Sequence, residues 1–98
     1  MTTQEQNTRI INCLLPYNPT KIGVFGSFAR GQNMPNSDLD LLVNFNISLD
    51  LFKFMKIWDD LEESLNLKID LVTDNALKSS NKIVQKSINK DIVIIYEK

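Results

Sequence analysis

Residues 26–43, GSFARGQNMPNSDLDLLV, contain a turn, a short polar loop and an acid-bearing strand. Gly26-Ser27 forms the turn, and Asp38 and Asp40 open an apolar segment. Side chains alternate between the two faces of a strand, so we expect both acids on one face and the apolar residues between and after them on the other.

A third acid follows the same logic further along the chain. Asp70 lies in the segment 67–73 between Ile69 and Leu71, which again predicts an acid on one face and apolar residues on the other. If the two strands are neighbours, three carboxylates converge on one patch. Such a cluster repels itself unless a cation neutralises it, and all-oxygen ligands suit magnesium. The pattern therefore predicts a metal-dependent active site.

Length and composition indicate one globular domain over residues 1–98, with 43% hydrophobic and 23% charged residues. A net charge of -1 gives no long-range attraction for a polyanion, which disfavours a nucleic-acid-binding role. One cysteine and no histidine exclude an internal disulfide, a Cys/His zinc site and a Ser-His catalytic pair. We find no membrane-length apolar run and no signal-peptide pattern, so we expect a cytoplasmic protein with no membrane partner.

The hydrophobic periodicity predicts alternating helices and strands. One predicted helix, over 50–65, carries an apolar stripe of Leu51, Phe54, Trp58, Leu61 and Leu65. Phe52 lies outside this stripe and could be exposed. Strands are predicted over 21–25, 38–45, 67–73 and 91–96. A first helix is predicted over 3–15, where Pro16 ends it, and a helical turn with Ser27 as its N-cap ends near Gly31. A last helix is predicted over 80–89, with Ile83, Val84 and Ile88 facing inward. We therefore expect an α+β fold, an α/β sandwich with four strands in one sheet covered by helices.

Each motif also has an ordinary structural explanation. Gly26-Ser27 is a common turn, although a glycine also lets a phosphate approach the backbone and Ser27 adds a hydroxyl donor. Arg30 could orient this loop or reach a phosphate. Paired acids such as Asp38 and Asp40 often keep a strand end in solvent. The combination of turn, acid pair and third acid is difficult to explain as surface decoration, which favours the functional interpretation.

This combination resembles the nucleotidyltransferases of the DNA polymerase beta superfamily, and within it the minimal nucleotidyltransferases (MNT) often encoded beside HEPN proteins in toxin–antitoxin pairs. The resemblance implies the nucleotidyltransferase fold with a mixed sheet. It implies that Asp38, Asp40 and Asp70 are catalytic and hold two magnesium ions. It also implies that ATP is the substrate, bound by Gly26, Ser27, Arg30 and Ser37, and that an acceptor hydroxyl attacks its α-phosphate while pyrophosphate leaves.

A domain of this size has little surface left for an acceptor, so we expect the acceptor on another chain. The resemblance implies a HEPN-type toxin, with AMP transferred to a side-chain hydroxyl, expected to be tyrosine, and this chain as the antitoxin. Two other functions stay open: a non-catalytic module that neutralises its partner by binding, and nucleotidyl transfer to a small molecule. The sequence also leaves open a homodimer or a hetero-oligomer.

Overall fold

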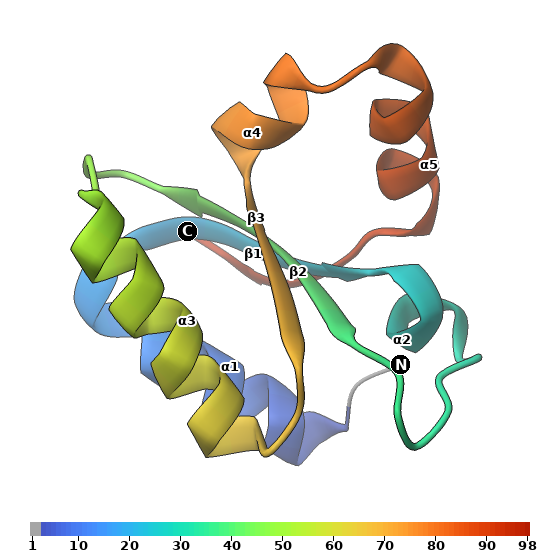
Figure 1. Cartoon of the computed structure of the whole chain (residues 1–98), viewed down its shortest axis with the longest axis horizontal. Coiled ribbons are helices and arrows are strands. Elements are labelled where there is room, and N and C mark those ends of the chain that lie inside the picture. Colours follow the sequence, from blue (N-terminus) through green and yellow to red (C-terminus); the bar gives the residue numbers. More distant parts are fainter. Residues whose placement is uncertain (1–2) are drawn as a thin grey trace.

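A four-stranded mixed sheet forms the centre of the chain in our computed structural model, which describes residues 3–98 (Figure 1). The strands are β1 (Pro19–Phe25), β2 (Leu39–Phe45), β3 (Ile69–Thr73) and β4 (Val93–Glu97). Their order is β3-β2-β1-β4. Strand β1 is antiparallel to β2 and β4, and β2 is parallel to β3. The parallel pair needs a long crossover, which α3 provides.

Helices cover both faces of this sheet (Figure 1). They are α1 (Gln4–Leu14), α2 (Gly26–Arg30), α3 (Leu51–Leu65), α4 (Asp74–Ser79) and α5 (Lys82–Asp91), and the short 3-10 helix η1 (Leu15–Tyr17) follows α1. Helix α1 begins at a capping box formed by Thr3 and Gln6, and the Asp50 carboxylate accepts a hydrogen bond from the Lys53 N–H at the start of α3. None of these helices of residues 3–98 has the length and apolar character needed to cross a lipid bilayer.

Two apolar clusters hold the layers together. The larger cluster joins α1 and α3 to one sheet face, and its members include Ile10, Leu14, Ile22, Val24, Leu39, Leu41, Val43, Ile57 and Leu61. The smaller cluster lies on the opposite face, where Phe25 and Leu42 meet Leu77 of α4 and Ile88 of α5. The second face is covered less completely, because no residue of α5 is fully buried. The acids of β2 and β3 lie on this less covered face, since Asp40 alternates with the core residues Leu39 and Leu41.

The predicted fold class is confirmed, and all four strands are present with boundaries shifted by up to two residues. Three local expectations are wrong. The N-cap of α2 is Phe25 and not Ser27, because the helix begins one residue before Ser27, at Gly26. On α3, the stripe holds from Phe54 to Leu65, but Leu51 is exposed.

The inward face predicted for the last helix is also wrong in part. Ile83 is 80% exposed and Val84 is 42% exposed, whereas Ile88 packs in the smaller cluster as expected. Leu77 of α4 packs in the same cluster as Ile88, so α4 and α5 share this face of the sheet. The periodicity of α5 alone gives no information on this neighbour.

Candidate active site

The strand register brings the turn and two of the acids together. Asp40 is the direct neighbour of Asp70 across the parallel β2–β3 pair, and on its other side it is the neighbour of Phe25, the last residue of β1. Gly26 follows Phe25 directly, so the Gly-Ser turn begins beside Asp40. The acid-bearing strands are therefore neighbours, which is the condition for their carboxylates to share one patch.

Gly26 and Asp40 are in close contact. Gly26 has a φ of 73°, a left-handed conformation that side chains rarely adopt. A Cβ atom at this position would overlap the Oδ2 atom of Asp40. The Asp40 carboxylate therefore lies directly on the backbone of the turn, in space that only a glycine leaves open. The turn and the acid form a single structural unit.

The carboxylates influence one another electrostatically. The pKa of Asp40 is raised from 3.8 to about 6, first by burial and then by the negative charges of Asp70 and Asp38, while the charge of Arg30 opposes the shift. Asp40 is half-buried, and Asp38 and Asp70 are exposed. Two acids from β2 and its preceding loop and one from β3 thus share a single negative patch.

The donors in this patch fit a hard divalent cation. All three are carboxylates, and the repulsion that raises the Asp40 pKa is the kind that a bound cation relieves. Within residues 3–98, however, no three side chains of Asp, Glu, Cys or His already lie close enough to form a complete metal-binding group. A metal here would rely on oxygen donors from its substrate in addition to the protein, as magnesium commonly does in phosphoryl-transfer sites.

The other predicted nucleotide-binding residues lie around this patch. Arg30 forms an ion pair of 2.7 Å with Asp91 and donates a second hydrogen bond of 3.1 Å from Nε to Gln32. Of the two roles expected for Arg30, these contacts fit orientation of the loop. The Ser37 hydroxyl accepts a hydrogen bond of 2.7 Å from the Met34 N–H, so it shapes the loop before Asp38.

Sequence reasoning missed two residues that hold β3 in place. The Trp58 Nε1–H donates a 2.7 Å hydrogen bond to the Ile69 carbonyl, and the Glu62 carboxylate accepts a 2.9 Å bond from the Ile69 N–H. Ile69 directly precedes Asp70 on the edge strand, so α3 fixes the backbone from which this acid projects. Trp58 and Glu62 are four residues apart and share a helix face, and this spacing is the signal that could have revealed them.

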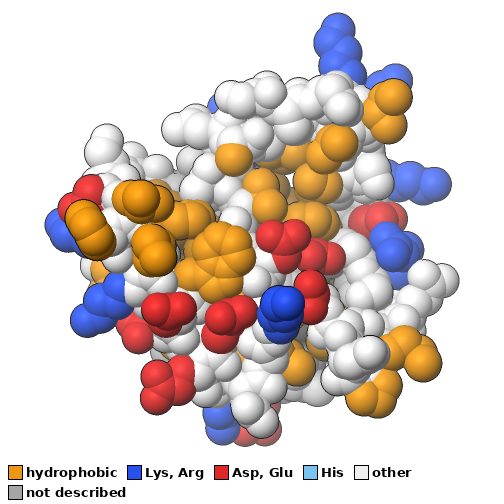
Figure 2. All heavy atoms as spheres, in the orientation of Figure 1, with side chains coloured by type: hydrophobic (Ala, Val, Ile, Leu, Met, Phe, Trp, Pro, Cys, Tyr) orange, Lys and Arg blue, Asp and Glu red, His pale blue; other side chains and the backbone are white. Residues whose placement is uncertain are grey.

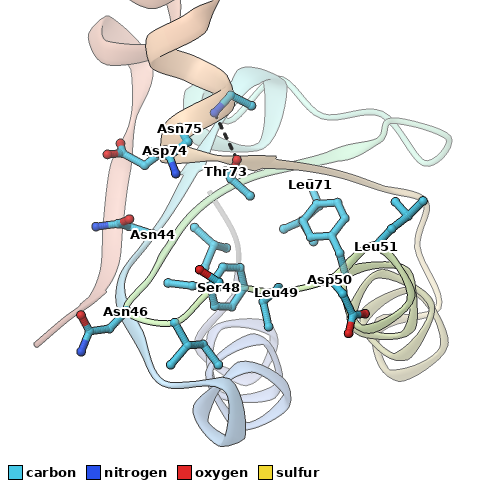
Figure 3. A pocket seen from close by; sticks show the side chains of 15 residues that line it. Asn44, Asn46, Ser48, Leu49, Asp50, Leu51, Leu71, Thr73, Asp74 and Asn75 are labelled. Carbon is cyan, nitrogen blue, oxygen red and sulfur yellow. Dashed lines mark hydrogen bonds between the residues drawn. The ribbon is translucent and has the colours of Figure 1, made fainter.

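A cavity of about 750 Å³ opens at the other end of β3 (Figure 3). It lies between the start of α3 and the junction of β3 with α4, where the Thr73 hydroxyl accepts a hydrogen bond of 3.2 Å from the Ala76 N–H. Its walls combine apolar side chains, among them Leu51 and Leu71, with the amides of Asn44, Asn46 and Asn75. No motif in the sequence predicts this cavity.

Comparison with known proteins identifies relatives along nearly the whole chain. Residues 8–98 match the family model described as polymerase beta, nucleotidyltransferase. The protein adenylyltransferase MntA of Thermococcus cleftensis is 39% identical over 75 residues, which cover 76% of this chain and 73% of that protein.

Solved structures show the same fold. A chain of a toxin–antitoxin complex with AMP-PNP superimposes with a TM-score of 0.78 at 23% identity, covering 94% of this chain and 73% of that chain. A chain of the Shewanella oneidensis complex between a tri-AMPylated HEPN toxin and its MNT antitoxin gives a TM-score of 0.72 at 21% identity, covering 97% and 72%. At these identities the likeness is one of fold.

Proposed function

Since this chain belongs to the polymerase beta nucleotidyltransferase family, we propose that it transfers AMP from ATP to a side-chain hydroxyl of a HEPN-type toxin and thereby acts as its antitoxin. In this proposal residues 1–98 act as one nucleotidyltransferase domain. The observation that carries the proposal is the register that sets Asp40 between Asp70 and the Gly-Ser turn. The named activity of the MntA relative and the AMPylated toxin of the Shewanella complex supply the substrate and the partner.

Asp38, Asp40 and Asp70 are the proposed catalytic residues. Magnesium bound by these carboxylates and by the triphosphate would neutralise charge on the attacking and leaving oxygens. Gly26 and Ser27 would contact the distal phosphates, because the glycine admits a phosphate to the backbone and the serine offers a hydroxyl. Arg30 and Ser37 would keep the two surrounding loops in position through their contacts with Asp91 and Met34.

The reaction is an in-line displacement at the α-phosphorus. The acceptor oxygen forms a bond to the α-phosphorus, the bond from that phosphorus to the bridging oxygen breaks, and pyrophosphate leaves. The proton of the acceptor hydroxyl passes to a carboxylate of the patch, for which Asp70 is best placed because it lies exposed on the edge strand. Since the reaction consumes ATP, we propose a cytoplasmic location for the pair.

Pyrophosphate release tests this proposal. The wild-type chain with magnesium, ATP and the HEPN partner should release pyrophosphate, and it should release little when the partner is left out. Asp40→Asn should reduce the rate by roughly a hundredfold or more, because a positioned charge is lost at the reacting phosphate. Release that is independent of the partner would point to water or a small molecule as the acceptor.

Neutralisation by binding alone is the second candidate, and one observation favours it. The apolar side chains of Leu51, Phe52 and Met55 on α3 are exposed and offer a contact surface that needs no catalysis. The variant Asp38→Asn/Asp40→Asn separates the two functions in cells that express the toxin. Loss of protection supports catalysis, and full protection supports binding alone.

A further inference from the structure

Large apolar side chains are exposed at the start of α3. Ile47 is 46% exposed, Leu51 68%, Phe52 85% and Met55 53%, and we call these four residues the docking patch. Single exposed apolar residues are common, but four within residues 47–55 are typical of an interaction site. Figure 2 shows exposed hydrophobic side chains over this part of α3, on the same face as a central group of acidic side chains.

The patch borders the side of α3 that builds the core. Leu51 and Met55 are four residues apart and Phe52 and Met55 three, so the three side chains lie together on the first turns of the helix. Ile57 and Leu61 point into the core instead. In the first turns of α3 the apolar surface therefore extends beyond the core side, and its outer part is exposed in residues 3–98.

The patch borders the cavity at the end of β3. Ile47 and Leu51 line this cavity together with Phe54, Leu71 and Thr73 (Figure 3). A groove with apolar walls next to projecting apolar side chains fits the apolar face of an amphipathic helix, in which side chains at three- and four-residue spacing enter the groove.

The groove lies within reach of the candidate active site. Thr73 follows Asp70 by three residues on β3, a distance of about 10 Å along an extended strand. Strand β3 is at the edge of the sheet, so a protein on the groove can extend along it to the exposed Asp70 carboxylate. A small acceptor would have no use for this surface, whereas a protein acceptor needs an anchor beside the reacting groups.

We propose that the docking patch and its groove bind an apolar helical face of the protein acceptor and hold its hydroxyl at Asp70. This proposal rests on the proposed function, because that function supplies the acceptor protein. It adds the surface that selects the acceptor and sets its distance from the catalytic acids.

Phe52→Glu tests the proposal, with Ile83→Glu as the matched control. Phe52 is the second residue of α3 and Ile83 the second residue of α5, and they are 85% and 80% exposed. Each helix begins at a capping side chain, Asp50 for α3 and Asn81 for α5. A glutamate in the first turn is favoured by the helix dipole, so both variants should fold. Met55→Glu is a second variant of the patch.

Affinity for the purified HEPN partner is measured for each variant, with ATP affinity and the size of the chain alone as further readouts. We expect Phe52→Glu and Met55→Glu to weaken the complex by about 30-fold or more, as for the loss of an interface hot spot, and to slow AMP transfer at low partner concentration. ATP affinity should stay unchanged, and Ile83→Glu should behave as the wild type in every assay.

Three results would overturn the docking site: unchanged partner affinity in both patch variants, a loss of ATP affinity in them, or a change in the oligomeric state of the chain alone. The second result would assign the patch to the nucleotide and the third to a second copy of the chain. Failure of the proposed function looks different, because the wild type would then bind the partner through the patch and transfer no AMP.

Discussion

Asp40 is the side chain on which the candidate site depends, because it touches each of the other parts. Its carboxylate lies on the backbone of Gly26, its strand neighbour is Asp70, and the charge of Arg30 acts on it. Burial and repulsion raise its pKa to about 6, so in the ligand-free chain this acid changes its charge near neutral pH. A bound cation would reverse that balance and favour the charged form.

Gly26→Ala should disable the site as well as strain the turn. The new Cβ would overlap the Asp40 carboxylate, and alanine disfavours the φ of 73°. We expect a loss of about 1–2 kcal/mol in unfolding free energy and a near-complete loss of AMP transfer. Gly31→Ala is the control, since Gly31 has a similar φ of 71° but follows α2 at its far end. If both variants keep the same activity, the contact between turn and acid has no catalytic role.

Asp40 should also make the metal-free chain less stable as the pH rises. Its folded pKa of about 6 exceeds its ordinary value of 3.8, so between these values the folded state holds more protons than the unfolded state. The contribution of Asp40 to unfolding free energy is therefore highest below the lower value and is lost as the pH rises through the upper one.

The variant Asp40→Asn removes this loss. Near pH 7 it should exceed the wild type by about 1–2 kcal/mol in unfolding free energy, after allowance for solvent screening, and the gap should narrow toward pH 4. Denaturant unfolding in metal-free buffer measures both values. Asp59→Asn makes the same change in net charge on the exposed surface of α3 and serves as the control. A gap that does not depend on pH would contradict the environment described for Asp40.

Helix α3 and strand β3 act as a pair, because two side chains of the helix bond to the backbone at Ile69. Trp58→Phe keeps most of the ring but removes the hydrogen bond of 2.7 Å. We expect a loss of about 1 kcal/mol in unfolding free energy and a fall in AMP transfer of roughly tenfold, since Asp70 loses its fixed position.

Ile57→Val is the control for this prediction. It removes one methyl group from the buried side of α3 and leaves the bonds to β3 intact. It should lower stability by about 1 kcal/mol and keep activity. Equal loss of activity in both variants would mean that the packing of α3, and not its hydrogen bond to β3, supports the site.

The ion pair between Arg30 and Asp91 connects α2, which follows the turn, to the end of α5. Asp91→Asn should raise the KM for ATP with a smaller effect on kcat, because the loop around the triphosphate is held less firmly while the acids stay in place. Glu5→Gln breaks the exposed pair with Arg9 on α1 and should change neither constant. Steady-state kinetics at varied ATP decide between these outcomes.

Helices and strands could be predicted where the spacing of their own apolar residues determines which side is buried. The alternation around Asp38 and Asp40 predicts which residues of β2 are buried, and the stripe from Phe54 to Leu65 predicts the core side of α3. The exposure of Ile83 could not be predicted, because the periodicity of α5 does not show that α4 covers part of the same sheet face. The bonds from Trp58 and Glu62 to Ile69 likewise depend on how α3 crosses the sheet.

In the complete chain the parallel β2–β3 pairing makes the acid-bearing strands neighbours, a pairing that the sequence leaves as a condition. The sequence contains no sign of the cavity, which arises where separate elements meet, and of the docking patch it indicates only Phe52, which lies outside the apolar stripe of α3. The chain therefore offers acids at one end of its edge strand and an apolar groove at the other. This division fits an enzyme that binds its acceptor as a folded protein.

The mass of the HEPN partner after incubation with the chain, magnesium and ATP shows whether AMP has been transferred. The wild type should add the mass of one or more AMP groups to the partner, and Asp38→Asn/Asp40→Asn should add none although it still binds the partner. A partner that keeps its original mass with the wild-type chain, or gains the same mass with the double variant, would contradict the account.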